Sequence, residues 1–400
     1  MKEKFKVICA ACRHVQSKRY SPQCEKCGGL TEAEFDLSKV VLKDSDNPYE
    51  RYFDLIPVLD KELLPKKEKM TPLIHAQSLG EKIGLSNLYL KNETANPTGT
   101  TKYKMAAISL PYLFESGVKH FCTSSTGNSS TAYATLLPMI PDLEMSLFTG
   151  SEFRERVNYE SNSKLTHYIL HDASFAEAFV VAAAFADKKG HTAERGFFNL
   201  GRREGLKLAW LESVEQIGKP IHWYVQAVSS AMGVYGTYKA SKELKTLGVS
   251  SITPKLLCAQ QASCQPMVQA WEEGAATIEQ RHIVEHPKGI AKAILRGDPT
   301  KVYPYMKAIV DESGGAFSSV VEDEIKDAQK LVLEHEGVEI CFSAATAVAS
   351  VIKLARNGRI GSEETILVNL TGSDRVYDRV PDDVIHLNKV QGEWVDSKGI

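Results

Sequence analysis

Two lysines follow a turn in the segment NPTGTTKYKM, which spans residues 96–105. The Asn-Pro-Thr-Gly start favours a turn, and Lys102 and Lys104 come directly after it. Most lysines in such a position lie on the solvated first turn of a helix. A lysine there can also form a Schiff base with a carbonyl cofactor, if its surroundings lower its pKa. The rest of the chain has to decide between these interpretations.

Four of the eight cysteines have the spacing of a metal site. They occur as C-x2-C-x11-C-x2-C, at Cys9, Cys12, Cys24 and Cys27. Two such pairs can converge tetrahedrally on one zinc ion and hold together a segment with too little core to fold alone. A pair of disulfides, or a site that has lost its metal, are the alternatives. The other cysteines stand singly in apolar contexts and are expected to be small core residues: Cys122, Cys258, Cys264 and Cys341.

Composition and charge limit the class of protein. The chain has 400 residues, enough for two or more domains, and its net charge of −2 creates no field that would attract nucleic acid or an anionic membrane. Residues 1–30 are locally basic, so a nucleic-acid-binding ribbon is a rival, but they show no alternation of bases with aromatic residues suited to stacking. The apolar run at 179–186 is far shorter than the ~18 residues of a membrane span. We expect a soluble cytoplasmic protein.

Beyond a charged connector, short apolar runs alternate with segments of helical periodicity. The expected strands are 87–93, 120–125, 144–150, 167–172, 221–228, 254–260 and 365–370. The expected helices are 104–117, 129–137, 175–189, 205–218, 322–337 and 342–358. This alternation predicts an α/β protein with parallel sheets and helices on both faces.

Three turns follow expected strands and are rich in small or hydroxyl residues. They are SSTGNSS (124–130), SSAMGVYG (229–236) and LTGSD (370–374). In parallel α/β folds ligands collect at the carboxyl ends of strands, where helix N-termini favour anions. Each turn taken singly could also be an ordinary capping or packing turn.

Taken together and in order, these motifs resemble the pyridoxal-phosphate enzymes of the threonine synthase type, which have the tryptophan-synthase-β-like fold, fold type II. The resemblance covers nearly the whole chain and is carried by RYFDLIP (51–57), TPL (71–73), LGEKIGLSNLYLKNETANPTG (79–99), SSTGNSS (124–130), RREG (202–205), AILRGDP (293–299), FSAATA (342–347) and LTG (370–372). It implies a two-domain fold with parallel-rich sheets and a zinc-ribbon-like start. The implied parts are a ribbon at 1–40, a large cofactor-binding domain at 41–105 and 215–400, and a smaller α/β domain at 106–214.

The resemblance also implies roles for single residues. Lys102, three residues past the glycine of the Pro-Thr-Gly motif, corresponds to the lysine that carries the cofactor and moves protons. Asn128 would bond the pyridine ring oxygen, and Thr371 would face the pyridine nitrogen. The cofactor phosphate would be held by Ser229, Ser230, Ala231, Met232 and Gly233. Ser125 and Thr126 would bind the substrate carboxylate, and Arg202 a phosphate on the substrate.

Several positions depart from the threonine synthase pattern. The Asp-Arg pair that usually follows the lysine is Tyr103 and Lys104 here, and the usual glycine-rich phosphate turn reads Ser-Ser-Ala-Met-Gly. Gly196 and Phe197 replace polar residues, which weakens the case for phosphohomoserine itself, and residues 224–241 look like cysteate synthase. We expect a homodimeric enzyme that eliminates phosphate from an O-phospho amino acid and adds a nucleophile. Cysteate-type replacement on phosphoserine, a relative making an unusual amino acid, and a non-catalytic zinc-ribbon protein are the alternatives.

Overall fold

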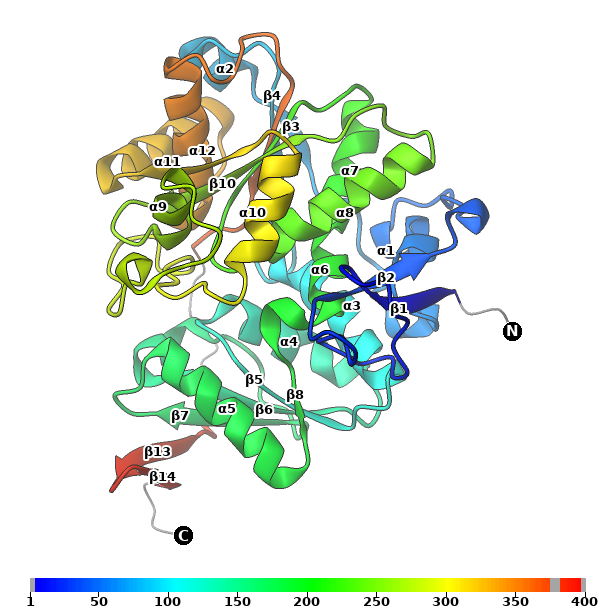
Figure 1. Cartoon of the computed structure of the whole chain (residues 1–400), viewed down its shortest axis with the longest axis vertical. Helices are drawn as coiled ribbons and strands as arrows, with labels where there is room; N and C mark the ends of the chain where they lie inside the picture. The colour runs from blue at the N-terminus through cyan, green and yellow to red at the C-terminus, as the bar shows by residue number, and fades with distance from the viewer. Residues whose placement is uncertain (1–3, 375–381, 397–400) are drawn as a thin grey trace. The chain divides into compact units, whose positions relative to one another are not determined.

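A computed structural model describes residues 4–374 and 382–396 of the chain (Figure 1). The chain divides into two compact units. Unit 1 comprises Met1–Glu68, Lys102–Gly205 and Arg375–Ile400, and unit 2 comprises Lys69–Thr101 and Leu206–Asp374. The expected boundaries near residues 40, 105 and 214 stay a prediction, because compactness alone does not show which parts fold independently.

Unit 2 contains a six-stranded sheet with the order β11-β10-β9-β12-β4-β3. The strands are β3 (Leu73–His75), β4 (Leu88–Asn92), β9 (Trp223–Ala227), β10 (Lys255–Gln261), β11 (Ala316–Val320) and β12 (Ile366–Leu370). All neighbours are parallel except β3, which runs antiparallel to β4. Every residue of β9 and β12 is buried, as expected for central strands covered on both faces.

Helices cover both faces of this sheet. They are α2 (Gln77–Ile83), α7 (Leu208–Ile217), α8 (Met232–Thr246), α9 (Pro266–Glu272), α10 (Tyr303–Glu312), α11 (Glu322–Glu336) and α12 (Phe342–Arg356). Side chains alternate along β9, so Val225 joins the core under α12 while Tyr224 packs edge-on against Trp210 of α7.

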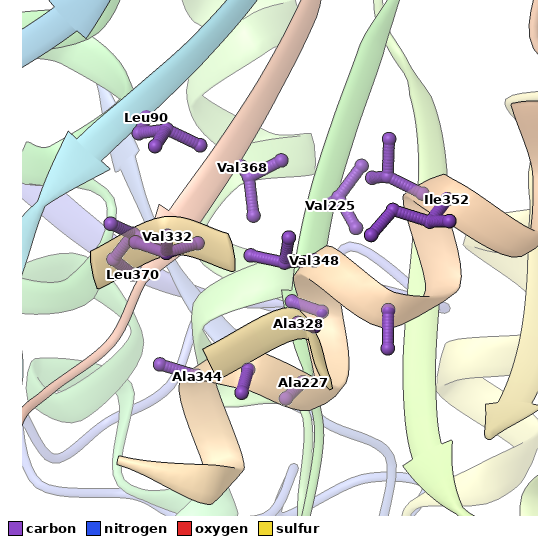
Figure 2. Close-up of a cluster of buried hydrophobic side chains, with 14 of the residues drawn as sticks. Leu90, Val225, Ala227, Ala328, Val332, Ala344, Val348, Ile352, Val368 and Leu370 are labelled. Carbon is purple, nitrogen blue, oxygen red and sulfur yellow. The ribbon is translucent and has the colours of Figure 1, made fainter. Parts of the chain in front are cut away.

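The core beneath α12 shows how the sequence pattern places that helix. Ala344, Val348 and Ile352 recur at intervals of four, so they share one helix face and meet Val225 and Val368 of the sheet (Figure 2). Full burial of each valine or isoleucine contributes about 1.5–3 kcal/mol relative to exposure. This packing holds the central strands, whose carboxyl ends carry two of the predicted ligand turns.

Unit 1 contains a second six-stranded sheet, with the order β14-β13-β7-β6-β5-β8. The strands are β5 (His120–Ser124), β6 (Glu144–Gly150), β7 (Leu165–Leu170), β8 (Thr192–Ala193), β13 (Ile385–Val390) and β14 (Glu393–Asp396). Only β14 is antiparallel to its neighbour.

One face of the unit 1 sheet is covered by α5 (Phe175–Lys189). The helix starts at Ser174, whose Oγ accepts a hydrogen bond from the backbone N–H of Glu177, and ends at Gly190 in the left-handed conformation. Its alanines at 178, 182 and 186 form one stripe, so the helix packs closely on the sheet. The remaining helices of unit 1 are α1 (Pro48–Arg51), α3 (Lys102–Glu115), α4 (Asn128–Leu136) and α6 (Leu200–Leu206).

The N-terminal hairpin belongs to unit 1. Strands β1 (Phe5–Cys9) and β2 (Thr31–Phe35) are antiparallel and pack on Tyr112 of α3 and Leu200 of α6. The Tyr20 hydroxyl donates to the carbonyl of Ala193 at 2.8 Å. The ribbon is therefore anchored on the body of unit 1.

The alternation of strands and helices is confirmed, and both sheets are parallel-rich. Helix 175–189 and strand 144–150 have the predicted ends, whereas the helix expected at 205–218 is two helices, α6 and α7. The prediction missed the strands β1, β2, β3, β8, β11, β13 and β14. Of these, β3 and β8 have only three and two residues, which carry too little periodicity to be recognised. None of the described helices is long and apolar enough to cross a membrane.

Candidate active site

Lys102 is the first residue of α3 and is partly buried. Its pKa is lowered from 10.5 to about 8, mainly because burial penalises the charged ammonium and further because Arg202 places a positive charge nearby. Lys104, two residues on, is only 1% exposed and lies within the core of unit 1. Of the two lysines, Lys102 is therefore the more accessible, and its lowered pKa makes the neutral amine that attacks a carbonyl easier to form.

The turn from β5 to α4 presents polar groups at a helix N-terminus. Gly127 has φ 128°, and a Cβ at this position would lie 2.6 Å from the carbonyl oxygen of Arg156, so only glycine fits. Ser125 Oγ accepts hydrogen bonds from the backbone N–H groups of Gly127 at 3.1 Å and Ser130 at 3.3 Å. Thr126 and Asn128 are partly exposed at the same turn.

Two buried hydroxyls beside this turn are unsatisfied. Within residues 4–374 and 382–396, neither Ser124 Oγ nor Ser130 Oγ has a hydrogen-bond partner. A buried hydroxyl without a partner costs roughly 1–3 kcal/mol, so such groups commonly await a ligand or water. Together with the N-terminus of α4, they suit an anionic ligand.

Arg202 lies on α6 and forms a buried ion pair that the sequence did not reveal. Its Nε donates to Glu194 Oε1 at 2.5 Å, and its Nη2 donates to Glu194 Oε2 at 2.6 Å. The same carboxylate accepts from Tyr133 Oη at 2.9 Å and from Asn199 Nδ2 at 2.7 Å. Arg202 Nη1 points to Ser129 Oγ at 3.3 Å, next to Asn128. Nothing around Glu194 in the sequence marks it, because its partners come from α4, α6 and the residue before α6, which only folding brings together.

In unit 2, the turn from β9 to α8 contains the five residues predicted to bind phosphate. Ala231 precedes the helix with φ 56°, a left-handed conformation that costs energy for a residue with a Cβ. Gly233 lies against Gln226, and a Cβ there would be 2.5 Å from Gln226 Oε1. Ser229 is partly exposed and Ser230 is buried. The turn thus has the hydroxyls, the helix N-terminus and the close packing that a phosphate cradle requires.

Thr371 follows β12 directly and is tied to the segment before Lys102. The backbone N–H of Thr101 donates to the Thr371 carbonyl at 2.9 Å, and Thr100 and Gly372 form an isolated bridge. Asn369, two residues before Thr371, donates to Gln226 Oε1 at 3.2 Å, which links β12 to β9 near the carboxyl ends of both strands. Within unit 2 the structure therefore brings the two predicted cofactor-binding turns together.

The four N-terminal cysteines cluster as their spacing predicts. Their Sγ atoms all lie within 4.8 Å of one another, with Cys9 and Cys27 at 3.5 Å and Cys12 and Cys24 at 3.7 Å. These separations are far from the ~2.05 Å of a disulfide bond and close to those of thiolates around one metal. Of the other cysteines, Cys122, Cys258 and Cys264 are buried and Cys341 is partly exposed. The cluster is compatible with zinc.

The two parallel-rich sheets have the fold of the fold type II pyridoxal-phosphate enzymes, and Lys102 and the two turns stay predicted site residues. The chain belongs to the family described as pyridoxal-phosphate dependent enzymes, which matches residues 64–372. It is 29% identical to threonine synthase of Methanosarcina acetivorans, over 87% of this chain and 86% of the relative. It is 27% identical to cysteate synthase of Methanosarcina barkeri, over 95% of this chain and 94% of the relative.

Solved structures show the same fold. Maize serine racemase aligns with a TM-score of 0.63 at 20% identity, and the alignment covers 77% of this chain and 89% of the racemase chain. Diaminopropionate ammonia lyase from Escherichia coli has a TM-score of 0.64 at 15% identity, over 78% of this chain and 86% of its own. The expected relationship to threonine synthase, with features of cysteate synthase, is confirmed.

Proposed function

We propose that this enzyme eliminates phosphate from an O-phospho amino acid and adds a nucleophile to the product. The leading reaction converts phosphohomoserine and water to threonine and phosphate. The observation that carries the proposal is Lys102, a partly buried amine with a pKa near 8 at the start of α3. Bound pyridoxal phosphate supplies the electron sink that acidifies the substrate α-proton.

The residues of this chain would bind the reactants and move protons. Lys102 would hold the cofactor covalently and, once displaced by the substrate amine, transfer protons through Nζ between the α carbon and its neighbours, which a pKa near neutrality favours. Ser125 and Thr126 would bind the substrate carboxylate at the N-terminus of α4. Asn128 would bond the ring oxygen.

In unit 2, the turn Ser229–Gly233 would hold the cofactor phosphate at the start of α8. Thr371 would face the ring nitrogen, where its neutral hydroxyl would leave that nitrogen largely unprotonated. This arrangement would favour elimination and replacement over transamination.

Arg202 stays our candidate for binding the substrate phosphate. Its Nε and Nη2 already donate hydrogen bonds to Glu194. A phosphate would therefore have to accept from Nη1, which points toward Ser129. The Glu194 charge also offsets much of the attraction of the guanidinium for an anion. Arg202 would therefore act as an oriented donor more than as a free positive charge.

The second candidate is replacement of the phosphate of phosphoserine by sulfite, as in cysteate synthase. It is favoured by residues 224–241 and by the cysteate synthase match over 95% of this chain. A specialised relative that makes an unusual amino acid shares the same chemistry. A non-catalytic zinc-ribbon protein would leave Lys102 idle, and the match of residues 64–372 to the pyridoxal-phosphate dependent enzyme family speaks against it.

Cofactor attachment tests the first step of the proposal. The purified protein should absorb visible light, and borohydride should fix the cofactor to the wild type and to Lys104→Ala but not to Lys102→Ala. Fixation that is lost only in Lys104→Ala would show that the wrong lysine is assigned.

Phosphate release tests the substrate. Phosphohomoserine and phosphoserine, each with and without sulfite, should be compared by phosphate release and by the amino acid formed. Threonine from phosphohomoserine supports the leading reaction, cysteate from phosphoserine and sulfite supports the second, and no release from either contradicts both.

Three further expectations belong to this proposal. We propose that Cys9, Cys12, Cys24 and Cys27 bind one structural zinc, since four thiolates leave no open position for a substrate. Anaerobically prepared protein should contain this zinc, and Cys24→Ser should lower the unfolding midpoint. A homodimer and a cytoplasmic location stay predictions, which sedimentation and cell fractionation can check.

A further inference from the structure

A second cluster of metal-ligand residues lies on the sheet of unit 1. His120 and Cys122 are two apart on β5, so their side chains point to the same face of the sheet. His191 directly precedes β8, whose Thr192 pairs with Phe121 of β5. The register therefore places His191 beside His120, and the two imidazole rings stack with centroids 3.8 Å apart.

The donor atoms of the three residues converge. One ligand atom from each of His120, Cys122 and His191 lies within 4.8 Å of the others, and Cys122 Sγ is 4.0 Å from His191 Nδ1. Ligand atoms around a tetrahedral zinc ion are separated by roughly 3.3–3.8 Å, given bond lengths of about 2.0–2.3 Å. Binding would also require the two imidazole rings, whose planes are now 18° apart in a stack, to turn out of that stack, because a metal lies in the plane of each ring that binds it.

His120 has a carboxylate next to one ring nitrogen, as histidines that bind metals usually have. His120 and Glu144 are partners across β5 and β6, and Glu144 Oε2 lies 3.1 Å from His120 Nδ1. His120 Nε2 lies 2.8 Å from the hydroxyl of Ser146, the strand partner of Cys122. A carboxylate that accepts from Nδ1 orients the ring and balances the metal charge, but the metal would have to replace the Ser146 hydroxyl as the partner of Nε2 or bind beside it.

We propose that His120, Cys122 and His191 bind a zinc ion, distinct from the four-cysteine cluster. Two imidazoles and one thiolate suit zinc, and the fourth position would be taken by water or by the Ser146 hydroxyl. Binding requires the Cys122 thiol to give up its proton to solvent. The alternative is a metal-free cluster held by ring stacking and hydrogen bonds alone.

The position of this site indicates a structural role. It lies at the amino ends of β5 and β6, whereas the turn with Ser125 and Asn128 follows the carboxyl end of β5. Strand β8 has only two residues, so few backbone hydrogen bonds hold it on the sheet (Figure 1). A metal on His191 would fix this edge and, three residues later, Glu194, the partner of Arg202.

Zinc stoichiometry of the full-length holoenzyme tests the proposal. We expect two zinc ions per chain in the wild type, and one in Cys122→Ser and in His191→Gln. His386→Gln is a matched control, because the stacked pair of His171 and His386 has no third ligand among the described residues and should leave two. A zinc content that is the same in the wild type and in both ligand variants would overturn the proposal, whatever the occupancy of the four-cysteine cluster.

A measurement without any variant guards against misfolding. Crystals of the wild type grown with zinc should give an anomalous difference peak at the zinc edge among His120, Cys122 and His191, besides the peak at the four cysteines. A map with a peak only at the four cysteines contradicts the proposal. The cobalt-substituted protein should likewise show two sets of d–d bands, since a site with one thiolate differs from a site with four.

Discussion

The ion pair of Arg202 and Glu194 should be a main determinant of the stability of unit 1. Arg202 is 5% exposed and Glu194 1%, and the carboxylate accepts two charge-assisted hydrogen bonds of 2.5 and 2.6 Å from the guanidinium. Tyr133, Asn199 and the Gly196 N–H also donate to it. In Glu194→Gln, the new side-chain NH2 group would direct its two N–H donors at Arg202, Tyr133 or Asn199, which are themselves donors.

The size of the effect follows from burial. Breaking a buried pair by removing one partner leaves an uncompensated charge and costs about 3–5 kcal/mol, and Glu194→Gln should fall in this range. Urea denaturation of the holoenzyme, with an unchanged slope, measures the cost. Glu62→Gln is the control, because Glu62 pairs with Lys66 on the exposed surface and its loss should leave the midpoint unchanged.

A double-mutant cycle separates the pair from its surroundings. Arg202→Met should be about as destabilising as Glu194→Gln, since it strands the carboxylate, and the double variant should be clearly less destabilised than the sum of the two. A loss below about 1 kcal/mol in Glu194→Gln, or strict additivity, would refute the argument that the two charges stabilise each other.

Three other predictions follow from the geometry of the site. Because the pKa of Lys102 is lowered to about 8, the unfolded chain binds more protons than the folded apoenzyme between pH 8 and 10.5. The stability of the apoenzyme relative to Lys102→Met should therefore rise over this range, and a constant difference would contradict the lowered pKa. If Arg202 binds the leaving phosphate, the kcat/KM of Arg202→Lys should fall by more than about tenfold, or ~1.4 kcal/mol, while its cofactor content stays unchanged. Wild-type kcat/KM in this variant would show that Arg202 does not bind the phosphate. Gly233→Ala should lower cofactor content measured by visible absorbance, because the new Cβ would lie 2.5 Å from Gln226 Oε1, while Gly361→Ala, with no atom nearer than 3.6 Å, should not.

The sequence by itself was enough to predict the fold class and the main motifs. Helix α5 could be read to the residue, because it starts at a serine cap, ends at a glycine and carries an alanine stripe between them. The cysteine spacing predicted the cluster at Cys9 and Cys27, and the order of motifs singled out Lys102. These are local features, which depend on neighbours along the chain.

Only the tertiary structure shows the contacts that join distant segments. Glu194 follows a two-residue strand and has no motif of its own, yet it meets Arg202, Tyr133 and Asn199 in the folded chain. His191 comes next to His120 only because β8 pairs with β5 in one register. Such contacts depend on strand order and helix packing, which are set by the burial of the whole core. They therefore cannot be predicted from any short segment of the sequence.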